Sequence, residues 1–431
     1  MKITAKLLVI IVLIVSFFQF KVYCSSPSFT SDVASVILID NATGAVLHEE
    51  NSEKIVYPAS TTKIMNAIVA IENAELETVM TASSQAVHNI GIDGMHVGIS
   101  PGEQLTFNDL LHAMLVKSAN DAANIIAENI AGSIDAFVEL MNKKAKELGA
   151  LNTNFKNAHG CHDPEHYTTA NDMAKIARYA MSIPKFREVV LTTCYVIPPT
   201  NICSKPKEIY SSNKLYYEHT TGPTVFYPYA TGIKTGFTSE AGYNFVGAAR
   251  KDYIELISVV MGCTKNGLTN EVFKITKDIL DYGFSNFSMQ QIVKPNSLFS
   301  TVAVKNSKAG ALLNINTAEG VTALMPNNKD DWNIKITPYI NPDLHAPVKK
   351  GDVVGYAEYC KYNTVTDKIN LIADNDVDWS LNSYIYSSIN NCRYPFLSKA
   401  LIAVIILLTL HLIIIRPVIR RICKYCIYKS R

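Results

Sequence analysis

The spacing of hydrophobic residues along the first two-thirds of the chain predicts a mixture of strands and helices. Two β-prone runs, 36–39 and 45–48, flank the segment 40–44, whose Asp, Asn and Gly residues favour a turn between two strands. Apolar residues then recur at helical spacing in four stretches, 64–74, 110–116, 121–131 and 134–148. The first of these is apolar nearly all round, which is typical of a helix buried on most sides.

Sheet character returns later in the chain. The runs 243–249 and 254–261 predict a hairpin, and 270–282 predicts a closing amphipathic helix. Strands near both ends with helices between them predict one α/β (α+β) domain over residues 30–285. Its mixed antiparallel sheet would unite the N-terminal and C-terminal strands.

The pattern changes again from residue 287 to about 378. Short β-prone runs are separated there by Asn, Pro, Gly and Lys, as in 301–304, 334–336 and 352–357. This predicts a small all-β sandwich domain. It contains no recognisable nucleophile constellation, so we expect a spacer or docking module.

The N-terminus predicts export. Lys2 and Lys6 precede an apolar run at 7–20, the layout of a secretory signal, which we assign to residues 1–24. A retained N-terminal anchor is the alternative, because Tyr23 and Cys24 are imperfect substitutes for the small residues preferred at a cleavage site.

The C-terminus predicts a membrane anchor. Residues 396–415 are almost entirely apolar and long enough to span a bilayer. The tail 416–431 carries six Lys and Arg residues and no acidic residue, so it should remain cytoplasmic. The sequence therefore predicts a single-pass protein of the cell membrane, with lipid around its helix and its catalytic domain on the extracytoplasmic face. A buried core helix is the alternative.

Composition narrows the possible partners. The chain has 431 residues, of which 48% are hydrophobic, and this excludes a disordered protein. Lys and Arg total 40 against 38 Asp and Glu, which argues against a nucleic-acid-binding surface. Nine cysteines are spread without a dense framework; Cys194 and Cys203 are the nearest candidates for a disulfide, although spacing cannot establish connectivity.

A first candidate for catalysis is Ser60-Thr61-Thr62-Lys63, at the predicted start of a helix. Ser60 and Lys63 would share one helical face, where a buried lysine of lowered pKa could deprotonate the hydroxyl. The motif is weak alone, since a Ser N-cap followed by a solvated lysine gives the same pattern.

Two further motifs follow. Ser118-Ala119-Asn120 falls in the break between two predicted helices, where its hydroxyl could relay protons and its amide could hold a substrate carbonyl. Lys234-Thr235-Gly236 lies on a strand predicted to begin near Thr231. Such a strand can bind an extended peptide, Gly236 permits close approach, and Lys234 and Thr235 can bind a terminal carboxylate.

The order Ser-x-x-Lys, Ser-x-Asn, Lys-Thr-Gly is known from serine β-lactamases and penicillin-binding proteins. Over residues 36–285, including 118–124, 157–160 and 232–238, the chain resembles the low-molecular-mass penicillin-binding proteins of peptidase family S11. The resemblance implies a β-lactamase/DD-peptidase-like fold and D-alanyl-D-alanine carboxypeptidase activity on peptidoglycan stem peptides. It also implies β-lactam inhibition and no metal or cofactor.

The resemblance assigns a role to each motif residue. Ser60 would be the nucleophile and Lys63 its base, with Ser118 and Asn120 in proton relay and substrate positioning. Lys234, Thr235 and Thr238 would bind the terminal carboxylate beside Gly236, and the backbone N–H groups of Ser60 and Phe237 would form the oxyanion hole. Some relatives carry an arginine on the strand after the hairpin, where this chain has Glu255.

Three alternatives remain open from the sequence. A β-lactamase shares the nucleophile, but residue 119 is Ala rather than the Asp of Ser-Asp-Asn. A zinc peptidase is suggested by His162 and His166, although Pro164 interrupts any helix that would align them. A non-catalytic wall-binding scaffold on the same fold is the third.

Overall fold

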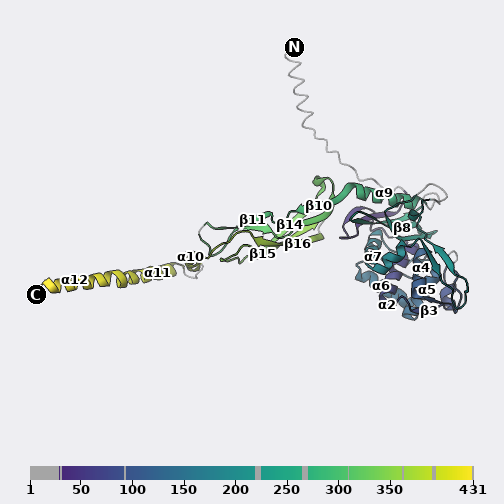
Figure 1. Cartoon of the computed structure of the whole chain (residues 1–431), viewed down its shortest axis with the longest axis horizontal. Coiled ribbons are helices and arrows are strands. Elements are labelled where there is room, and N and C mark those ends of the chain that lie inside the picture. Colours follow the sequence, from purple (N-terminus) through teal and green to yellow (C-terminus); the bar gives the residue numbers. More distant parts are fainter. Residues whose placement is uncertain are drawn as a thin grey trace, which may run out of the picture. The chain divides into compact units, whose positions relative to one another are not determined.

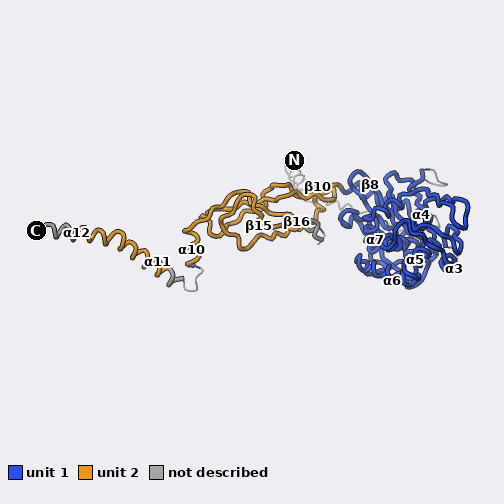
Figure 2. Tube along the Cα trace, turned by 60° about the horizontal axis from the view of Figure 1, so that its bottom comes forward, with its two compact units in different colours: residues 1–287 blue, residues 288–431 orange. Residues whose placement is uncertain are grey.

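The computed structural model describes residue 29 and residues 32–91, 94–218, 225–264, 270–308, 310–361, 364–390 and 395–429. The predicted secretory signal at 1–24 lies outside the described residues. The chain divides into two compact units, Met1–Phe287 and Ser288–Arg431, which Figure 2 colours separately. Each unit has its own cluster of buried hydrophobic side chains.

The first unit contains one five-stranded antiparallel sheet with the strand order β2-β1-β9-β8-β7. Its strand β8 is labelled in Figure 1. Its strands are β1 (Ser35–Asp40), β2 (Val46–Glu50), β7 (Ala230–Thr238), β8 (Gly242–Lys251) and β9 (Ile254–Cys263). Because β1 pairs with β9, with Ile37 opposite Val259, strands from the two ends of the unit lie side by side. The prediction of one mixed α/β unit is confirmed.

Eight helices are described in the first unit. They are α2 (Lys63–Asn73), α3 (Ser84–His88), α4 (Phe107–Val116), α5 (Asn120–Ala131), α6 (Ile134–Glu147), α7 (Ala170–Ser182), α8 (Pro184–Leu191) and α9 (Asn270–Asn286). Every residue of α2 from Lys63 to Ala70 is buried, as the apolar pattern predicted. A short 3₁₀ turn, η1 (Ala59–Thr62), leads directly into it.

Helices cover both faces of the sheet. On one face Phe245 of β8 packs on Phe273 of α9, with ring centroids 4.8 Å apart. The next residue, Val246, points the other way into the large cluster that includes Met173 of α7. Since both faces are buried, β8 and β9 read as nearly continuous hydrophobic runs rather than as alternating ones.

Two small hairpins complete the first unit, β3 (Val79–Thr81) with β4 (Gln104–Thr106) and β5 (Cys194–Ile197) with β6 (Lys207–Tyr210). The suggested disulfide is wrong, because Cys194 and Cys203 are both free thiols. Cys194 lies opposite Tyr210 in the hairpin, whereas the Cys203 thiol donates to the carbonyl oxygen of Lys205 at 3.4 Å in the connecting loop.

The second unit begins with a β domain. Its two sheets have the strand orders β10-β13 and β11-β12-β16-β15-β14. The strands are β10 (Phe287–Val293), β11 (Leu298–Ala303), β12 (Leu312–Thr317), β13 (Val321–Pro326), β14 (Ile334–Ile340), β15 (Val353–Lys361) and β16 (Thr364–Ala373). Leu313, Ile315, Ala357 and Leu371 are fully buried in its core. The prediction of a C-terminal β domain is confirmed.

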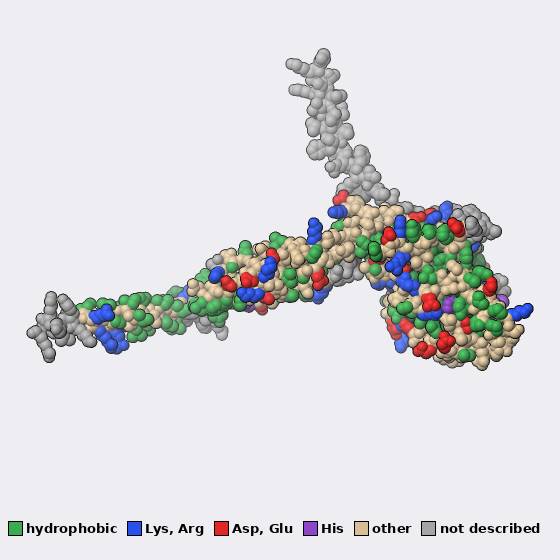
Figure 3. Space-filling model, viewed as in Figure 1, with side chains coloured by type: hydrophobic (Ala, Val, Ile, Leu, Met, Phe, Trp, Pro, Cys, Tyr) green, Lys and Arg blue, Asp and Glu red, His purple; other side chains and the backbone are tan. Residues whose placement is uncertain are grey.

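Helices follow the β domain to the end of the described chain. They are α10 (Leu381–Asn390), α11 (Pro395–Leu410), a π-helical segment (His411–Ile415) and α12 (Arg416–Lys429). Within them, the 24 residues Lys399–Ile422 are long and apolar enough to cross a membrane, by length and composition. Figure 3 shows hydrophobic side chains along this helix and Lys and Arg side chains gathered near its far end.

Candidate active site

Ser60 lies on the 3₁₀ turn that begins the buried helix α2. The preceding Ala59 has a φ of 49°, a left-handed conformation that is uncommon for a residue with a side chain. Asn244 of β8 fixes this turn from the sheet side, because its amide donates to the carbonyl oxygens of Tyr57 and Pro58 at 2.8 and 3.1 Å. The hydroxyl is therefore presented on a rigid support.

Lys63 follows one helical turn later, and its amine makes three polar contacts. Nζ lies 2.9 Å from Ser60 Oγ, 2.7 Å from Asn120 Oδ1 and 2.7 Å from the carbonyl oxygen of His159. The last two atoms can only accept hydrogen bonds. A neutral amine has two N–H groups, which these acceptors use, and its lone pair then faces the Ser60 hydroxyl. The arrangement suits an amine that accepts a proton from Ser60.

Electrostatics favour that neutral form. Burial lowers the pKa of Lys63 well below its ordinary value, and the positive charge of the nearby Lys234 lowers it further. Burial likewise lowers the pKa of Lys234 to about 7. Both lysines are almost completely inaccessible to solvent, Lys63 at 0% and Lys234 at 1% exposure. Burial and the charge of Lys234 thus both favour the neutral form of Lys63.

Ser118 and Asn120 lie in the break between α4 and α5, as predicted. Ser118 is buried and has a φ of 69°, and Asn120 opens α5. The Asn120 amide is held at both ends, since Oδ1 accepts from Lys63 and Nδ2 donates to the carbonyl oxygen of Ile90 at 2.8 Å. Its backbone N–H also donates to the carbonyl oxygen of Met95 at 2.7 Å.

Strand β7 brings the Lys-Thr-Gly motif against the Ser60 turn. A Cβ atom at Gly236 would lie 3.0 Å from the Pro58 carbonyl oxygen and 3.1 Å from the Ser60 nitrogen, so this approach favours glycine. Lys234 Nζ donates to the Thr235 carbonyl oxygen at 3.1 Å, and Thr235 Oγ1 lies 2.8 Å from Ser212 Oγ.

The end of β7 is more open. Phe237 is 54% exposed and stacks on Tyr243, with ring centroids 4.4 Å apart. Thr238 Oγ1 accepts a hydrogen bond from the Ala241 N–H at 3.1 Å. The structure thus places Ser60 and Asn120 within hydrogen-bonding distance of the Lys63 amine. It also packs the strand that carries Lys234 to Thr238 against the Ser60 turn.

The segment 157–160 contributes more than its sequence suggested. A Cβ atom at Gly160 would lie 1.9 Å from the Ala59 carbonyl oxygen and 2.9 Å from the Ser60 nitrogen, and Gly160 has a φ of 94°. Asn66 of α2 donates to the carbonyl oxygen of Ala158 at 2.9 Å, which fastens the segment to the catalytic helix. The sequence singled out 157–160 only as part of the family resemblance. It assigned no role to Gly160 or to the carbonyl of His159, because it did not show which segment would lie against Ser60.

Asp121 is another residue whose role the sequence did not reveal. Its buried carboxylate accepts hydrogen bonds from the N–H groups of Val97, Gly98 and Ile99 at 3.0 to 3.3 Å. These bonds hold the segment 94–100, which in turn contacts the Asn120 backbone. Asp121 therefore positions the loop beside the site rather than acting in it.

Glu255 does not lie beside Lys234. Its carboxylate accepts from Arg187 Nη1 at 2.5 Å and from Asn41 Nδ2 at 2.7 Å. It also lies 3.4 Å from Thr231 Oγ1, three residues and so about 10 Å along β7 from Lys234. Glu255 therefore contacts Arg187, Asn41 and Thr231 at the start of β7, and the sequence had left its effect on carboxylate recognition open.

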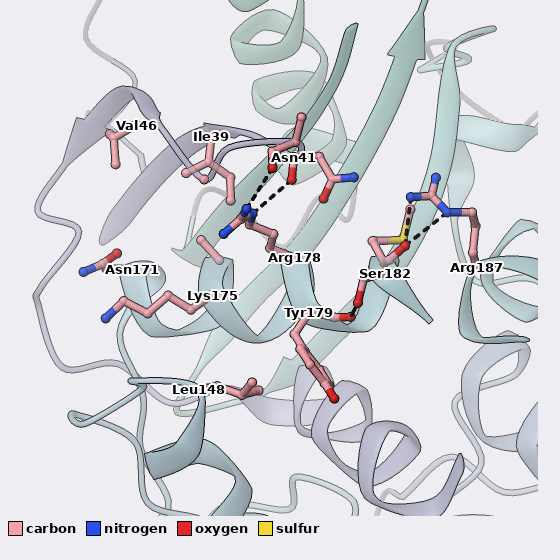
Figure 4. A pocket seen from close by; sticks show the side chains of 14 residues that line it. Ile39, Asn41, Val46, Leu148, Asn171, Lys175, Arg178, Tyr179, Ser182 and Arg187 are labelled. Carbon is pink, nitrogen blue, oxygen red and sulfur yellow. Dashed lines mark hydrogen bonds between the residues drawn. The ribbon is translucent and has the colours of Figure 1, made fainter. Parts of the chain in front are cut away.

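A pocket of about 470 Å³ lies near these contacts, between the β1–β2 turn and α7 (Figure 4). The positively charged side chains that line it already have partners within the protein. Arg178 donates to the carbonyl oxygens of Asn41 and Ala42 at 3.0 and 2.8 Å, and Lys175 contacts Asp172 at 3.1 Å. The Arg178 contacts join α7 to the β1–β2 turn, whereas the Lys175 contact lies within α7.

The histidines of the segment 159–166 have structural partners. His166 Nδ1 accepts from the Lys156 N–H at 3.1 Å, and Nε2 then donates to Thr62 Oγ1 at 2.8 Å. Burial lowers the pKa of His166 to about 4, in keeping with a neutral ring. His162 packs edge-on against Tyr57, with ring centroids 4.7 Å apart. Within the described part of the chain, no group of three or more His, Cys, Asp or Glu residues could hold a metal ion.

Comparison with known proteins gives the family of the chain. Residues 22–265 match the peptidase S11 family model, described as D-alanyl-D-alanine carboxypeptidase, and residues 287–378 match the model of the penicillin-binding protein 5 C-terminal domain. The chain is 32% identical over 335 residues to D-alanyl-D-alanine carboxypeptidase DacF of Bacillus subtilis, covering 76% of this chain and 82% of DacF. It is 30% identical over 338 residues to DacC of Escherichia coli, covering 76% and 80%.

A solved structure of a penicillin-binding protein is also similar to this chain. Penicillin-binding protein 5 of Haemophilus influenzae superposes with a TM-score of 0.62 at 27% identity, covering 82% of this chain and 99% of that one. The catalytic fold is therefore that of the penicillin-binding proteins and β-lactamases, and the relatives favour neither a β-lactamase nor a scaffold. The chain belongs to peptidase family S11, the D-alanyl-D-alanine carboxypeptidases, which are serine hydrolases.

Proposed function

We propose that this carboxypeptidase removes the terminal D-Ala of peptidoglycan stem pentapeptides with Ser60 as nucleophile and Lys63 as general base. The observation that carries the proposal is the set of contacts made by the Lys63 amine. When its two N–H groups donate to Asn120 Oδ1 and to the His159 carbonyl oxygen, its lone pair faces Ser60 Oγ, 2.9 Å away. Burial lowers the pKa of that amine and so favours the neutral form that a general base requires.

Acylation follows from this arrangement. Lys63 takes the hydroxyl proton of Ser60 as Oγ attacks the carbonyl carbon of the penultimate D-Ala. The N–H groups of Ser60 and Phe237 stabilise the developing oxyanion. The C–N bond to the terminal D-Ala then breaks, and the proton held by Lys63 passes to the leaving amine, with Ser118 as relay and Asn120 holding the substrate.

Deacylation reuses the same groups. A water molecule attacks the ester carbon while Lys63 accepts one of its protons. The bond between carbon and Ser60 Oγ breaks, and Lys63 returns the proton to the serine oxygen. A β-lactam would acylate Ser60 in the same way, but its ring-opened leaving group stays attached, so we expect a long-lived adduct.

Recognition of the free C-terminus rests on β7. The ammonium of Lys234 with the hydroxyls of Thr235 and Thr238 would bind the terminal carboxylate, and Gly236 allows the substrate backbone to lie close to the strand. A bound carboxylate would raise the pKa of Lys234 and so keep it charged in the complex.

We further propose the arrangement of this protein in the cell. A signal at residues 1–24 would direct export, and residues 30–285 would form the catalytic domain. Residues 287–378 would act as a spacer domain. The apolar helix, assigned to 396–415 from sequence and continuous to Ile422 by composition, would hold the protein in the cell membrane with the tail 416–431 in the cytoplasm.

The test is release of D-alanine from a stem pentapeptide by the full chain in detergent. We expect the wild type and a Ser182→Ala control to release one D-alanine per peptide, and Ser60→Ala to release none. Faster hydrolysis of penicillin than of the peptide would favour a β-lactamase instead. Binding of peptidoglycan without hydrolysis or penicillin labelling would favour a scaffold.

A further inference from the structure

The Cys161 thiol lies beside the catalytic groups, although none of the three motifs contains it. It follows Gly160, which packs against the backbone of Ala59 and Ser60. Asn157 locks this segment, because its Oδ1 accepts from the Gly160 N–H at 2.7 Å and its Nδ2 donates to the Cys161 carbonyl oxygen at 2.9 Å. The side chain of Cys161 is therefore fixed relative to the Ser60 turn.

The Cys161 thiol contacts both Asn120 and the carbonyl oxygen of Ile90, which Asn120 also contacts. Its S–H donates to the carbonyl oxygen of Ile90 at 3.3 Å, the same oxygen that accepts from Asn120 Nδ2 at 2.8 Å. Asn120 Nδ2 also lies 3.6 Å from Cys161 Sγ, within reach of a weak N–H···S hydrogen bond. The two hydrogens of the Asn120 amide group thus face Ile90 O and Cys161 Sγ, while its oxygen faces Lys63.

The thiol fills a confined space. A Cβ atom at Gly91 would lie 2.5 Å from Cys161 Sγ, so the sulfur occupies the room that this glycine leaves free. Burial raises the pKa of Cys161, so the group remains a protonated thiol that can donate to Ile90. A larger group on this sulfur would have to displace either the Ile90 segment or the Asn120 amide.

We propose that Cys161 is a positioning residue that holds the Asn120 amide in the orientation required by Lys63. Covalent modification of its thiol should therefore slow acylation of Ser60. The proposal rests on the proposed function, since it assumes that Asn120 and Lys63 act in acylation. Cys161 itself forms no bond with substrate. Its effect passes through Ile90 and Asn120.

The first test compares Cys161→Ala and Cys161→Ser in the full chain, with Cys194→Ala as matched control. The readout is the second-order rate constant of acylation by a fluorescent penicillin. We expect Cys161→Ala to lower it about three- to tenfold, as for loss of one modest hydrogen bond. Cys161→Ser should recover most of this loss because its hydroxyl can still donate to Ile90. A thiol that only filled space would not give this rescue.

The second test caps the thiol with iodoacetamide. The sulfur attacks the CH₂ carbon, an S–C bond forms, iodide leaves and the thiol proton passes to solvent. We expect alkylation mapped to Cys161 by mass spectrometry to reduce acylation of the wild type and of Cys194→Ala, but not of Cys161→Ser.

The outcomes separate the two proposals. If the wild type is not acylated by penicillin at all, the proposed function fails and this inference fails with it. If the wild type is acylated but Cys161→Ala matches it, and alkylated Cys161 leaves the rate unchanged, only the role of Cys161 is overturned.

Discussion

Replacing Gly160 with alanine tests whether backbone contact, rather than residue chemistry, holds the nucleophile in place. The new Cβ would lie 1.9 Å from the Ala59 carbonyl oxygen and 2.9 Å from the Ser60 nitrogen. Real Cβ atoms essentially never approach within 3.0 Å of another heavy atom, so one of the two segments must move by about 1 Å. Ser60 lies on one of these segments, and the His159 carbonyl that binds Lys63 lies on the other.

The magnitude follows from that displacement. A misplacement of about 1 Å in a catalytic group can cost on the order of 100-fold in rate. Alanine at a φ of 94° adds about 1–2 kcal/mol of backbone strain. We therefore expect Gly160→Ala to acylate with penicillin on the order of 100-fold more slowly than the wild type and to unfold at a lower temperature.

Gly149→Ala is the matched control. Gly149 also has a left-handed φ, 72°, but no heavy atom lies within 4 Å of the position that an added methyl group would take, so only the strain is shared. Stopped-flow acylation and thermal unfolding of both variants separate the two effects. Loss of stability in both variants with wild-type acylation in Gly160→Ala would refute the reasoning.

Three further predictions concern charge. Lys63→Met should lower acylation by about 10²- to 10⁴-fold, as for loss of a general base, whereas Lys143→Met should not, measured by the same stopped-flow assay. The value of kcat/KM for D-alanine release should rise with pH as Lys63 loses its proton and fall again above about pH 7 as free Lys234 loses its charge; a substrate with an amidated C-terminus should lack the alkaline fall. Glu255→Gln should lower the free energy of unfolding by about 1 kcal/mol through its weakened contact with Arg187, yet leave KM for the stem peptide within twofold of wild type.

Strands and helices whose hydrophobic residues recur at a regular spacing were predictable from the sequence. The β1–β2 and β8–β9 strands and the buried helix α2 each carry a run long enough to define its period. The short hairpin β3–β4 has strands of three residues, too few to show alternation, and was not predicted. The pairing of β1 with β9 could be inferred only because both ends of the unit were rich in strand signals.

The site was predictable only in part, because residue type reveals side-chain chemistry but not backbone contact. Ser60, Lys63 and Asn120 stand in motifs, and the structure places their polar atoms in one hydrogen-bonded group. The carbonyl of His159 and the absent side chain of Gly160 contribute just as directly, yet the resemblance at 157–160 did not reveal which backbone atoms they would contact. The partners of Glu255 were likewise not predictable, because its contacts with Arg187 and Asn41 join residues far apart in the sequence.

The central claim is that Ser60, activated by Lys63, forms the covalent acyl-enzyme. The most direct measurement is mass spectrometry of the full chain after incubation with benzylpenicillin, followed by peptide mapping. The account predicts one penicilloyl group per chain, located on the peptide containing Ser60, and none in Ser60→Ala. An adduct on another residue, or an unmodified wild type that still releases D-alanine, would contradict it.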